Sequence, residues 1–267
     1  MNQPMRAESP TQFANLVVEV DGPIMLVGLN RPEKRNAIND TTVLALEACF
    51  SSIPEGIRCV VLHGIGDNFS AGLDLSEITE RDVTEGVHHS RMWHRTFERI
   101  QFGPVPVVAV LKGAVIGGGL ELACAAHVRV AEHSTFYALP EGQRGIFVGG
   151  GGSVRLPRLI GAHRMADMML TGRTYRAEEG VPLGFSQYCV ANGEGMSVGR
   201  DLAGRIARNS PMTNFAVVQA LPRIVEADPT SGLMMESLIA AVAQSDKEAK
   251  ARIRAFLDKK AGKVSAN

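Results

Sequence analysis

The chain has 267 residues, of which 45% are hydrophobic and 21% are charged, as in ordinary globular proteins. A chain of this length can bury a sizeable core, which excludes disorder or disulfide stapling as the main basis of its structure. Its 28 Lys and Arg residues balance its 28 Asp and Glu residues, and only 5% of the residues are aromatic. It therefore lacks the basic excess and the stacking side chains typical of a nucleic-acid-binding protein.

No stretch of the sequence reaches the ~18 apolar residues that a membrane helix needs, and its polar start lacks the apolar core of a secretory signal. The cysteines are scattered and form no C-x-x-C motif, which favours buried free thiols in a reducing cytoplasm. They are Cys49, Cys59, Cys124 and Cys189. Three histidines on one predicted helix lack the i, i+4 spacing of a ligand pair, so no metal site is expected. They are His88, His89 and His94.

The first half of the sequence alternates apolar runs with turn and helix signals. Two runs that flank Asp21-Gly22-Pro23 predict a β-hairpin, and Asn39 or Asp40 is a suitable cap for the helix that follows. In chain order the predicted elements are strands over 16–20 and 24–29, a helix over 41–51, a strand over 58–63, a helix over 82–101 and a strand over 107–111. This alternation predicts a parallel α/β architecture.

The second half begins with three consecutive glycines, Gly117 to Gly119, which open a short helix. Strands are predicted over 127–131, 136–139 and 187–190, and helices over 212–226, 233–244 and 246–259. We therefore divide the chain near residue 200 into an α/β core, 1–200, and a helical region, 201–267. The last helices carry apolar residues with few partners in their own segment, which predicts packing on the core or on another subunit.

Two glycine-rich loops follow two of the buried strands, over residues 69–75 and 113–121. Glycine lets a backbone approach a ligand closely, and the first N–H groups of a helix have no partner within it. Two such N–H groups that converge from two loops form an oxyanion hole. The alternative is that both loops are tight turns between strands and helices. Neither loop has a dinucleotide or P-loop pattern, and the sequence has no G-x-S-x-G elbow of a serine hydrolase.

Two carboxylates adjoin these glycines. Glu121 lies in the first turn of the predicted helix, and Glu141 precedes a further glycine run, Gly149 to Gly152. One interpretation is a pair that holds a water molecule, with one residue as base and the other as acid. The alternatives are a carboxylate that merely favours a helix N-terminus and an exposed loop acid. The spacing alone does not decide between them.

Four strings, in this order, resemble the enoyl-CoA hydratase/isomerase (crotonase) family. They are LNRPEKRNAIN at 29–39, NFSAGLDLSEI at 68–78, PVVAVLKGAVIGGGLELACAAHVRVA at 106–131 and the segment around LPEGQRG at 139–145. The resemblance extends over nearly the whole chain, from about Asn15 to Lys260. It implies a crotonase-like α/β fold, a spiral of ββα units with C-terminal helices that form homotrimers, often paired into hexamers.

The resemblance also implies a site for an acyl-CoA thioester, which is the substrate, so no further cofactor is expected. The backbone N–H groups of Leu73 and Gly118 correspond to the oxyanion hole for the thioester carbonyl, although Leu73 replaces the smaller Ala that is usual in the family. In acyl-transfer enzymes the loss of one such donor costs on the order of 10²–10³ in rate. The residues expected to contact CoA are Lys34, Ala37, Ala71 and Asp74, with Lys259 or Lys260 reaching the CoA of a neighbouring subunit.

The hydratases of this family have two glutamates, and Glu121 and Glu141 match both. In that chemistry Glu121 activates the water that attacks Cβ, and Glu141 delivers a proton to Cα. The match favours hydration of a 2-enoyl-CoA to a 3-hydroxyacyl-CoA, an activity of fatty acid metabolism, or its reverse. The alternatives are a Δ3,Δ2-enoyl-CoA isomerase, which needs only the second acid, and a dehydratase specialised for a branched, aromatic or alicyclic acyl-CoA.

Two further alternatives lie outside these activities. A catalytically silent CoA-binding member need not retain both glutamates and both glycine loops. A serine peptidase of similar fold lacks a nucleophile here, because Ser70 lies in the oxyanion loop and Ser153 has no elbow. The sequence departs from the family mainly around the acyl group, in HHSRMW at 88–93 and GIFVG at 145–149. The residues expected to line the acyl pocket are Met92, Trp93, Phe147 and Val148.

Overall fold

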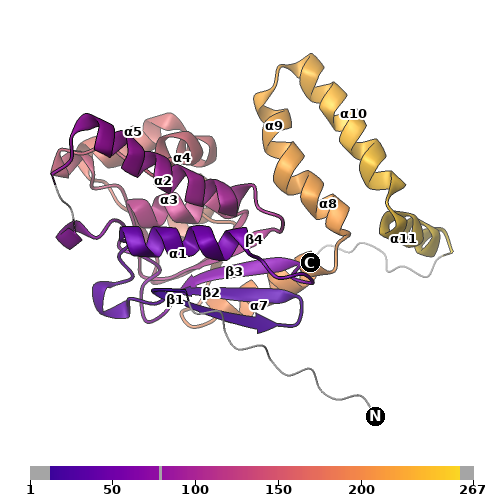
Figure 1. Cartoon of the computed structure of the whole chain (residues 1–267), viewed down its shortest axis with the longest axis horizontal. Coiled ribbons are helices and arrows are strands. Elements are labelled where there is room, and N and C mark those ends of the chain that lie inside the picture. Colours follow the sequence, from indigo (N-terminus) through magenta and orange to yellow (C-terminus); the bar gives the residue numbers. More distant parts are fainter. Residues whose placement is uncertain (1–12, 78–79, 259–267) are drawn as a thin grey trace, which may run out of the picture.

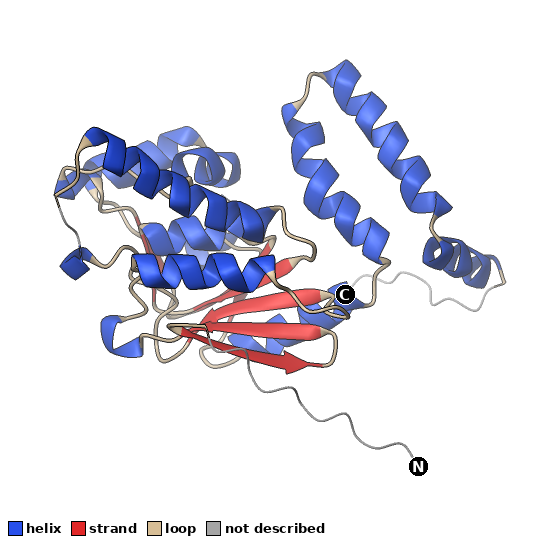
Figure 2. Cartoon of the chain, viewed as in Figure 1, coloured by secondary structure: helices blue, strands red, loops and turns tan. Residues whose placement is uncertain are grey.

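A six-stranded sheet forms the centre of the structure, a computed structural model that describes residues 13–77 and 80–258. Its strand order is β1-β2-β3-β4-β6-β9. These strands are β1 (Leu16–Asp21), β2 (Ile24–Leu29), β3 (Cys59–Gly64), β4 (Val107–Leu111), β6 (Val128–Glu132) and β9 (Tyr188–Val190). The first two form the predicted hairpin, and all other neighbours in the sheet are parallel. The predicted parallel α/β architecture is therefore confirmed (Figure 2).

Two long helices begin where the sequence offers caps. The side chain of Asn39 accepts a hydrogen bond from the Thr42 N–H at the start of α1 (Asp40–Ser51). At the start of α2 (Val83–Gln101), Asp82 and Glu85 form a reciprocal capping box. The caps fix the first turn of each helix, and apolar residues of both helices belong to one core cluster.

Helices cover both faces of this sheet, which explains why its central strands β3 and β4 are continuous runs of mostly apolar residues. Successive side chains of a strand point to opposite faces. Val60 and Leu62 of β3 belong to the larger core cluster, with apolar residues of α1 and α2, whereas Val61 belongs to a smaller cluster with α7 (Gly195–Ala207). Figure 1 shows α1 and α2 above the sheet and α7 beneath it.

A second, three-stranded sheet holds the glycine-rich loops in place. It consists of β5 (Ala114–Ile116), β7 (Phe136–Ala138) and β8 (Tyr175–Arg176). The sequence predicted a loop where β5 lies and did not predict β8, because two or three residues are too few to show strand periodicity. A bridge between Ser70 and Val115 joins the first glycine-rich loop to β5. The next helix, α3 (Gly118–Ala125), is buried along its whole length.

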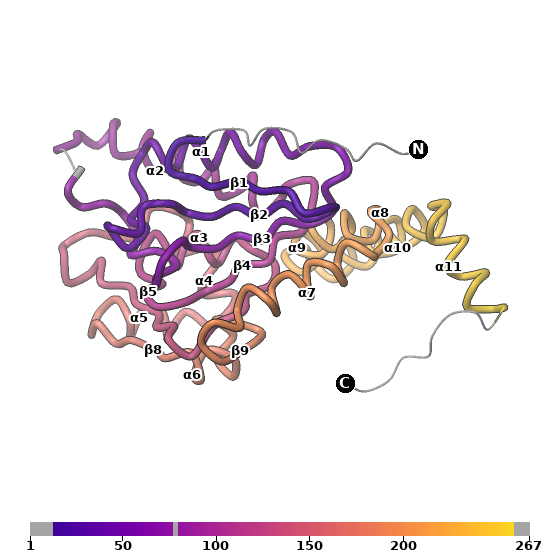
Figure 3. The backbone as a smooth tube through the Cα atoms, turned by 90° about the horizontal axis from the view of Figure 1, so that it is seen from below, coloured from indigo at the N-terminus to yellow at the C-terminus, as the bar shows by residue number. Residues whose placement is uncertain are grey.

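The remainder of the described chain is mostly helical and ends in a projecting arm. After α4 (Gly152–Ile160), α5 (Ala162–Thr171) and α6 (Ala177–Leu183), the chain enters β9 and α7. The arm comprises α8 (Pro211–Phe215), a π-helical turn (Ala216–Ala220), α9 (Leu221–Glu226), α10 (Pro229–Ser245) and α11 (Lys247–Leu257). Figures 1 and 3 show the arm extending away from the sheet. The proposed division near residue 200 falls inside α7, which packs on the sheet through Leu202 and Ala203.

The sequence led us to expect no membrane helix, no metal site and no disulfide bond, and the structure can be compared with these expectations over its described residues. None of the helices in this part of the chain combines the length and the hydropathy that a membrane span needs. The same residues hold no group of three or more His, Cys, Asp or Glu side chains arranged to bind a metal ion. All four cysteines are free, and three are buried as predicted, whereas Cys189 is partly exposed. Burial raises the pKa of Cys49 and Cys59 to about 12, so these thiols stay protonated.

Candidate active site

A cavity of about 440 Å³ lies between the two glycine-rich loops, α2 and the segment over 140–150. Both glutamates of the predicted pair, Glu121 and Glu141, line this cavity. So do Leu73 and Gly118, whose N–H groups are the predicted oxyanion hole. Residues that are far apart in the sequence thus meet at one cavity, as the two-carboxylate interpretation requires.

The backbone around Leu73 and Gly118 is fixed by hydrogen bonds on either side. The N–H of Ile38 donates to Gly72 O at 2.7 Å, and the N–H of Asp74 donates to Ile38 O at 2.9 Å. These two bonds flank Leu73 and leave its own N–H unused. The N–H of Gly118 is equally unused, since the first N–H of a helix has no intrahelical acceptor. Neither N–H has an acceptor among the described residues.

The two loops that carry these N–H groups touch each other. Gly72 has φ +86°, and a Cβ added to it would lie 3.0 Å from Gly118 N and 2.5 Å from Ile116 O. A Cβ added to Gly118 would lie 3.4 Å from Leu73 N and 2.8 Å from the Trp93 ring. Only glycine fits at either position. Two neighbouring donors without partners, at the wall of a cavity, can bind an oxygen that gains negative charge.

Glu121 is held by the glycine run that follows Glu141 in the sequence. Its Oε1 accepts hydrogen bonds from the N–H of Gly150 at 2.8 Å and of Gly152 at 2.7 Å. The side chain is 4% exposed. Burial raises the pKa of Glu121 to about 7, with a further contribution from the charge of Glu141 and an opposing one from the two N–H donors. The sequence contained the glycine run but gave no sign of this role.

Glu141 lies at the start of a short 3₁₀ helix (Gly142–Arg144) and is 7% exposed. Its Oε2 is buried and has no hydrogen-bond partner among the described residues. Burial raises the pKa of Glu141, and the nearby charge of Arg144 opposes that rise. A buried carboxyl oxygen without a protein partner is rare. It is suited to the protonated form of the acid, or to a contact with a bound molecule.

Of the residues predicted to line the acyl pocket, all but Met92 lie at the wall of the cavity. Trp93, Phe147 and Val148 line the cavity, and Phe147 is 68% exposed at its edge. Met92 packs against the hydrophobic core instead and is not among the described residues that line the cavity. The helix period explains this difference, because neighbours on α2 point in different directions. His89, Ser90 and Ile146 also line the cavity and lie in the two segments that depart from the family. Further lining residues that were not singled out from the sequence include Leu75, Arg81, Gly86, Ile116, Pro140 and Arg144.

A second hollow of about 390 Å³ adjoins the cavity and shares Ala71 and Arg144 with it. The predicted CoA contacts Lys34, Ala37, Ala71 and Asp74 all line this hollow. The other two predicted contacts, Lys259 and Lys260, lie outside the described residues. The two hollows are neighbours, since Leu73 and Leu75 also line both.

Asp74 organises the positive charges of this second hollow. Its Oδ2 lies 2.8 Å from Arg31 Nη2 and 3.0 Å from Lys34 Nζ, and its Oδ1 accepts a hydrogen bond from Ser76 Oγ at 2.6 Å. The Ser76 hydroxyl, followed by Lys34 and Arg31, holds the pKa of Asp74 well below its usual range. Asp74 is therefore a structural anion. Lys34 lines this hollow, its side chain is 42% exposed, and its Nζ also donates to Ser76 Oγ at 3.0 Å.

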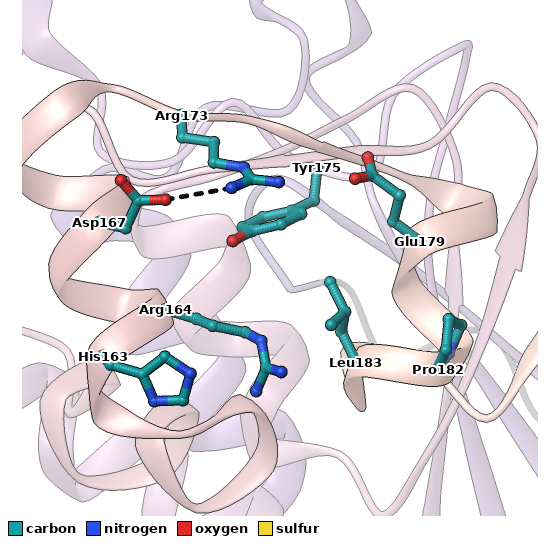
Figure 4. A pocket seen from close by; sticks show the side chains of 8 residues that line it. All are labelled: His163, Arg164, Asp167, Arg173, Tyr175, Glu179, Pro182 and Leu183. Atoms are coloured by element: carbon teal, nitrogen blue, oxygen red, sulfur yellow. Dashed lines mark hydrogen bonds and ion pairs between the residues drawn. The ribbon is translucent and has the colours of Figure 1, made fainter.

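A third hollow, of about 410 Å³, lies elsewhere on the surface beside α5 and α6 (Figure 4). Its charges are already paired or stacked: Arg173 lies 3.4 Å from Asp167 and 4.6 Å above the centre of the Tyr175 ring. No pair of buried carboxylates lines it, since neither Asp167 nor Glu179 is buried. Among the described residues, the combination that can do acid–base chemistry on a polarised carbonyl lies in the 440 Å³ cavity.

The fold defines a class of enzyme that is well represented among solved structures. The crystal structure of a provisionally named enoyl-CoA hydratase of Rhodopseudomonas palustris has a TM-score of 0.91 to this chain. The two are 66% identical, with 95% of this chain and 98% of the other covered. An enoyl-CoA hydratase of Bacillus anthracis gives a TM-score of 0.86 at 29% identity, over 92% of this chain and 97% of the other. The core is therefore crotonase-like, as predicted.

A sequence profile of the enoyl-CoA hydratase/isomerase family matches residues 19–265, and the chain belongs to this family of enzymes. The short-chain-enoyl-CoA hydratase of Clostridium acetobutylicum is 29% identical, over 93% of this chain and 97% of its own length. The relatives thus span almost the same length as this chain. The resemblance that the four strings predicted is confirmed at the level of the family.

Proposed function

We propose that the protein hydrates 2-enoyl-CoA thioesters to 3-hydroxyacyl-CoA, a reversible reaction. The observation that carries this proposal is the meeting of Glu121 and Glu141 at a cavity whose wall also offers the free N–H groups of Leu73 and Gly118. A hydratase needs two proton-transferring groups and a site for the negative charge on the thioester oxygen. The cavity provides residues for all three tasks.

The thioester carbonyl oxygen accepts hydrogen bonds from the N–H groups of Leu73 and Gly118. These bonds strengthen as the oxygen becomes enolate-like, which is how they lower the barrier. The donors are part of rigid loops, so they need no reorganisation when the charge develops. Hydrogen bonds to the carbonyl oxygen draw electron density from the conjugated double bond, so Cβ becomes more electrophilic and is attacked by water.

Glu121, as a carboxylate, accepts a proton from a water molecule while the water oxygen bonds to Cβ. The C2=C3 electron pair moves to Cα, where it takes the proton that Glu141 carries. The product is a 3-hydroxyacyl-CoA, and Glu121 is left protonated and Glu141 ionised. A proton passed between them, directly or through solvent, restores the starting state. Each proton transfer of this kind contributes about 10²–10⁴ in rate.

The two raised pKa values suit this division of labour. Burial raises the pKa of Glu141, which favours the proton that it must deliver. The N–H groups of Gly150 and Gly152 oppose the rise for Glu121 and favour the carboxylate that must act as base. Since the two groups interact, the pair titrates as a unit.

The CoA moiety lies in the second hollow in this proposal, with its phosphates near Lys34. Asp74 holds Lys34 at the wall of this hollow, and its carboxylate also contacts the buried Arg31. The acyl group extends past Trp93 towards Phe147. The exposure of Phe147 leaves room for acyl groups of more than one size.

Isomerisation of a 3-enoyl-CoA is the second candidate, because it uses Glu141 and the oxyanion hole alone. Glu121 then has no task, yet it is buried and held by two hydrogen bonds. Burying a carboxylate is unfavourable unless it is compensated. Its retention in the cavity favours hydration. The same observation counts against a silent CoA-binding protein.

The test is the loss of the conjugated enoyl-thioester absorbance when the purified protein is added to crotonyl-CoA. Longer, branched and aryl-substituted enoyl-CoAs are assayed alongside. Turnover of the straight chain identifies a general hydratase, and turnover of a bulky analogue alone identifies a specialised one. Silence over the whole set, together with isomerisation of 3-enoyl-CoA, would replace hydration by the second candidate.

The arm packs on further copies of the chain in this proposal, as the homotrimers of the resemblance imply. Its apolar side chains have little to contact within the described chain. Those at least 45% exposed are Phe215, Val217, Leu221, Val225, Leu233, Met234, Leu238, Val242, Ile253, Phe256 and Leu257. Apolar faces of this size are characteristic of subunit interfaces. Light scattering measures the assembly directly, and a monomer at micromolar concentration would contradict it.

A further inference from the structure

Ser90 lies on α2 at the wall of the active-site cavity, half-buried, and forms a short hydrogen bond to another segment. Its Oγ donates to the backbone oxygen of Gly149 at 2.6 Å. Its Oγ also lies 3.3 Å from Nε2 of His94, one helical turn further along. Since the hydroxyl has one proton and gives it to Gly149, His94 is the donor in the second contact. His94, Ser90 and Gly149 thus form one chain of hydrogen bonds.

The oxygen of Gly149 and the N–H of Gly150 belong to the same peptide unit. That unit is planar, and its C=O and N–H point in opposite directions. Ser90 therefore holds one end of the plane whose other end donates to Glu121 Oε1 at 2.8 Å. The residues on either side are glycines, which resist rotation of the plane least of all residues. Removal of the Ser90 hydroxyl therefore removes the hydrogen bond that it donates to the carbonyl end of this peptide.

A second, independent contact anchors the next peptide unit. Arg155 donates from Nη1 to Gly150 O at 3.0 Å, and its Nε donates to Gln101 Oε1 of α2 at 2.6 Å. Both anchors therefore connect α2 to the glycine run. The Arg155 contact holds the plane that contains the Gly151 N–H, which does not bind Glu121. Of these two anchors, the Ser90 contact acts on a peptide that reaches the carboxylate, and the His94 ring interacts with the same Gly149 carbonyl.

We propose that Ser90 is a positioning residue that aims the Gly150 N–H at Glu121, and that His94 in turn orients Ser90. The effect on catalysis rests on the proposed function, in which Glu121 is the base. The effect on the peptide plane does not depend on that function. Ser90 acts through the Gly149–Gly150 peptide and takes no part in proton transfer.

The variant Ser90→Ala removes the anchor and little else. The kcat for hydration falls about tenfold, the equivalent of one well-placed hydrogen bond, and KM is unchanged. The backbone N–H of Gly150 exchanges with solvent deuterium about tenfold faster, because its bond to Glu121 opens more often. Ser90→Thr retains a hydroxyl at this position and restores both values towards those of the wild type.

Ser153→Ala is the matched control, since Ser153 is exposed at the start of α4 and loses the same atom. It changes neither kcat nor the exchange of Gly150. A general loss of stability in Ser90→Ala would accelerate exchange in β3 and β4 as well, and the proposal requires the change to be confined to the glycine run. Unchanged exchange at Gly150 with unchanged kcat would overturn the proposal. If the wild type hydrates no enoyl-CoA, the proposed function fails while the exchange experiment still decides the role of Ser90.

Discussion

Gly117 stands so close to Glu141 that a Cβ added to Gly117 would lie 2.5 Å from Glu141 Oε1. Gly117 also has φ +50°, a conformation that residues with a side chain rarely adopt. The glycine that precedes Gly118, a proposed oxyanion-hole donor, therefore also makes room for the second carboxylate. Gly117 therefore links the proposed oxyanion donor, the Gly118 N–H, to the proposed acid, Glu141.

The variant Gly117→Ala is expected to displace Glu141 and to disturb the Gly118 N–H at the same time. We expect kcat for hydration to fall by at least about 10², the loss associated with one oxyanion donor. Steady-state kinetics on crotonyl-CoA measure it. Gly204→Ala in α7 is the control, because its added Cβ meets nothing closer than 3.8 Å and Ala favours a helix. Equal activity of Gly117→Ala and the wild type would exclude the proposed placement of Glu141.

The two carboxylates are expected to separate hydration from isomerisation. Glu141→Gln abolishes both, because hydration needs a proton delivered to Cα, and isomerisation of a 3-enoyl-CoA needs a proton taken from Cα and returned to C4. Glu121→Gln lowers hydration by about 10²–10⁴ and affects isomerisation much less, because only hydration needs an activated water. Parallel assays of crotonyl-CoA and a 3-enoyl-CoA give the two rates. A variant of either glutamate with full hydratase activity would refute the two-carboxylate mechanism.

The pH dependence of hydration is expected to report the buried carboxylate. The pKa of Glu121 is raised to about 7, mainly by burial, and its carboxylate is the active form. The rate therefore falls below about pH 7 as the pair takes up its second proton, and also at high pH as Glu141 loses the proton that it delivers, whereas an ordinary carboxylate base loses activity only near pH 4. Rates of kcat/KM between pH 5 and 9 test this expectation. A rate that stays constant down to pH 5 would mean that the base has an ordinary pKa.

Asp74 is expected to matter for stability and for CoA binding together. Asp74→Asn removes the buried carboxylate that Arg31 and Lys34 both contact, which we expect to lower the free energy of unfolding by about 3 kcal/mol and to raise KM for the thioester. Because the folded-state pKa of Asp74 is depressed, its contribution is present above the unfolded pKa and disappears as the pH falls through the folded one. Urea denaturation at pH 7 and in strong acid measures the free energy of unfolding and its dependence on pH, and steady-state kinetics measure KM.

A matched control exists in α7, where Asp201 and Arg205 form an ion pair with both side chains 55% exposed. Asp201→Asn is expected to change the free energy of unfolding by less than about 0.5 kcal/mol. Equal effects of the two substitutions would show that the burial of Asp74 has no energetic consequence.

The exposed face of the arm is expected to hold the assembly together. Leu238 is 61% exposed on α10, and Leu238→Arg places a charge in the proposed contact between copies. We expect light scattering to give a smaller particle for this variant than for the wild type. Leu44→Arg introduces the same change at a residue that is 50% exposed on α1 and should leave the assembly intact. An unchanged particle for Leu238→Arg would place the interface elsewhere.

Much of the fold follows from patterns that the sequence displays in full. Strands such as β3 and β4 are continuous apolar runs because both of their faces are covered, and α2 carries a capping box that marks its start. The short strands β5 and β8 were missed because their pairing is decided by tertiary contacts, which a local pattern does not contain. The position of α7 on the sheet is likewise a tertiary fact, decided by where Leu202 and Ala203 find apolar partners.

The candidate site shows the same limit at the level of side chains. Motif positions placed Glu121, Glu141, Leu73 and Gly118 at one cavity, because the family resemblance contains their spatial relation. Nothing in the sequence indicated that Gly150 would donate to Glu121, since that contact joins backbone to side chain across two segments. Met92 packs against the core although we expected it in the pocket. The helical period places neighbouring residues of α2 on different sides, and the prediction took Met92 and Trp93 together.

The measurement that tests the central claim most directly is the fate of crotonyl-CoA in water enriched in heavy oxygen, with the wild-type protein. The two-carboxylate account predicts rapid loss of the conjugated absorbance and a 3-hydroxyacyl-CoA that carries the heavy oxygen on Cβ, seen by mass spectrometry. Absorbance that persists, or a double bond that moves without uptake of oxygen, would contradict the account.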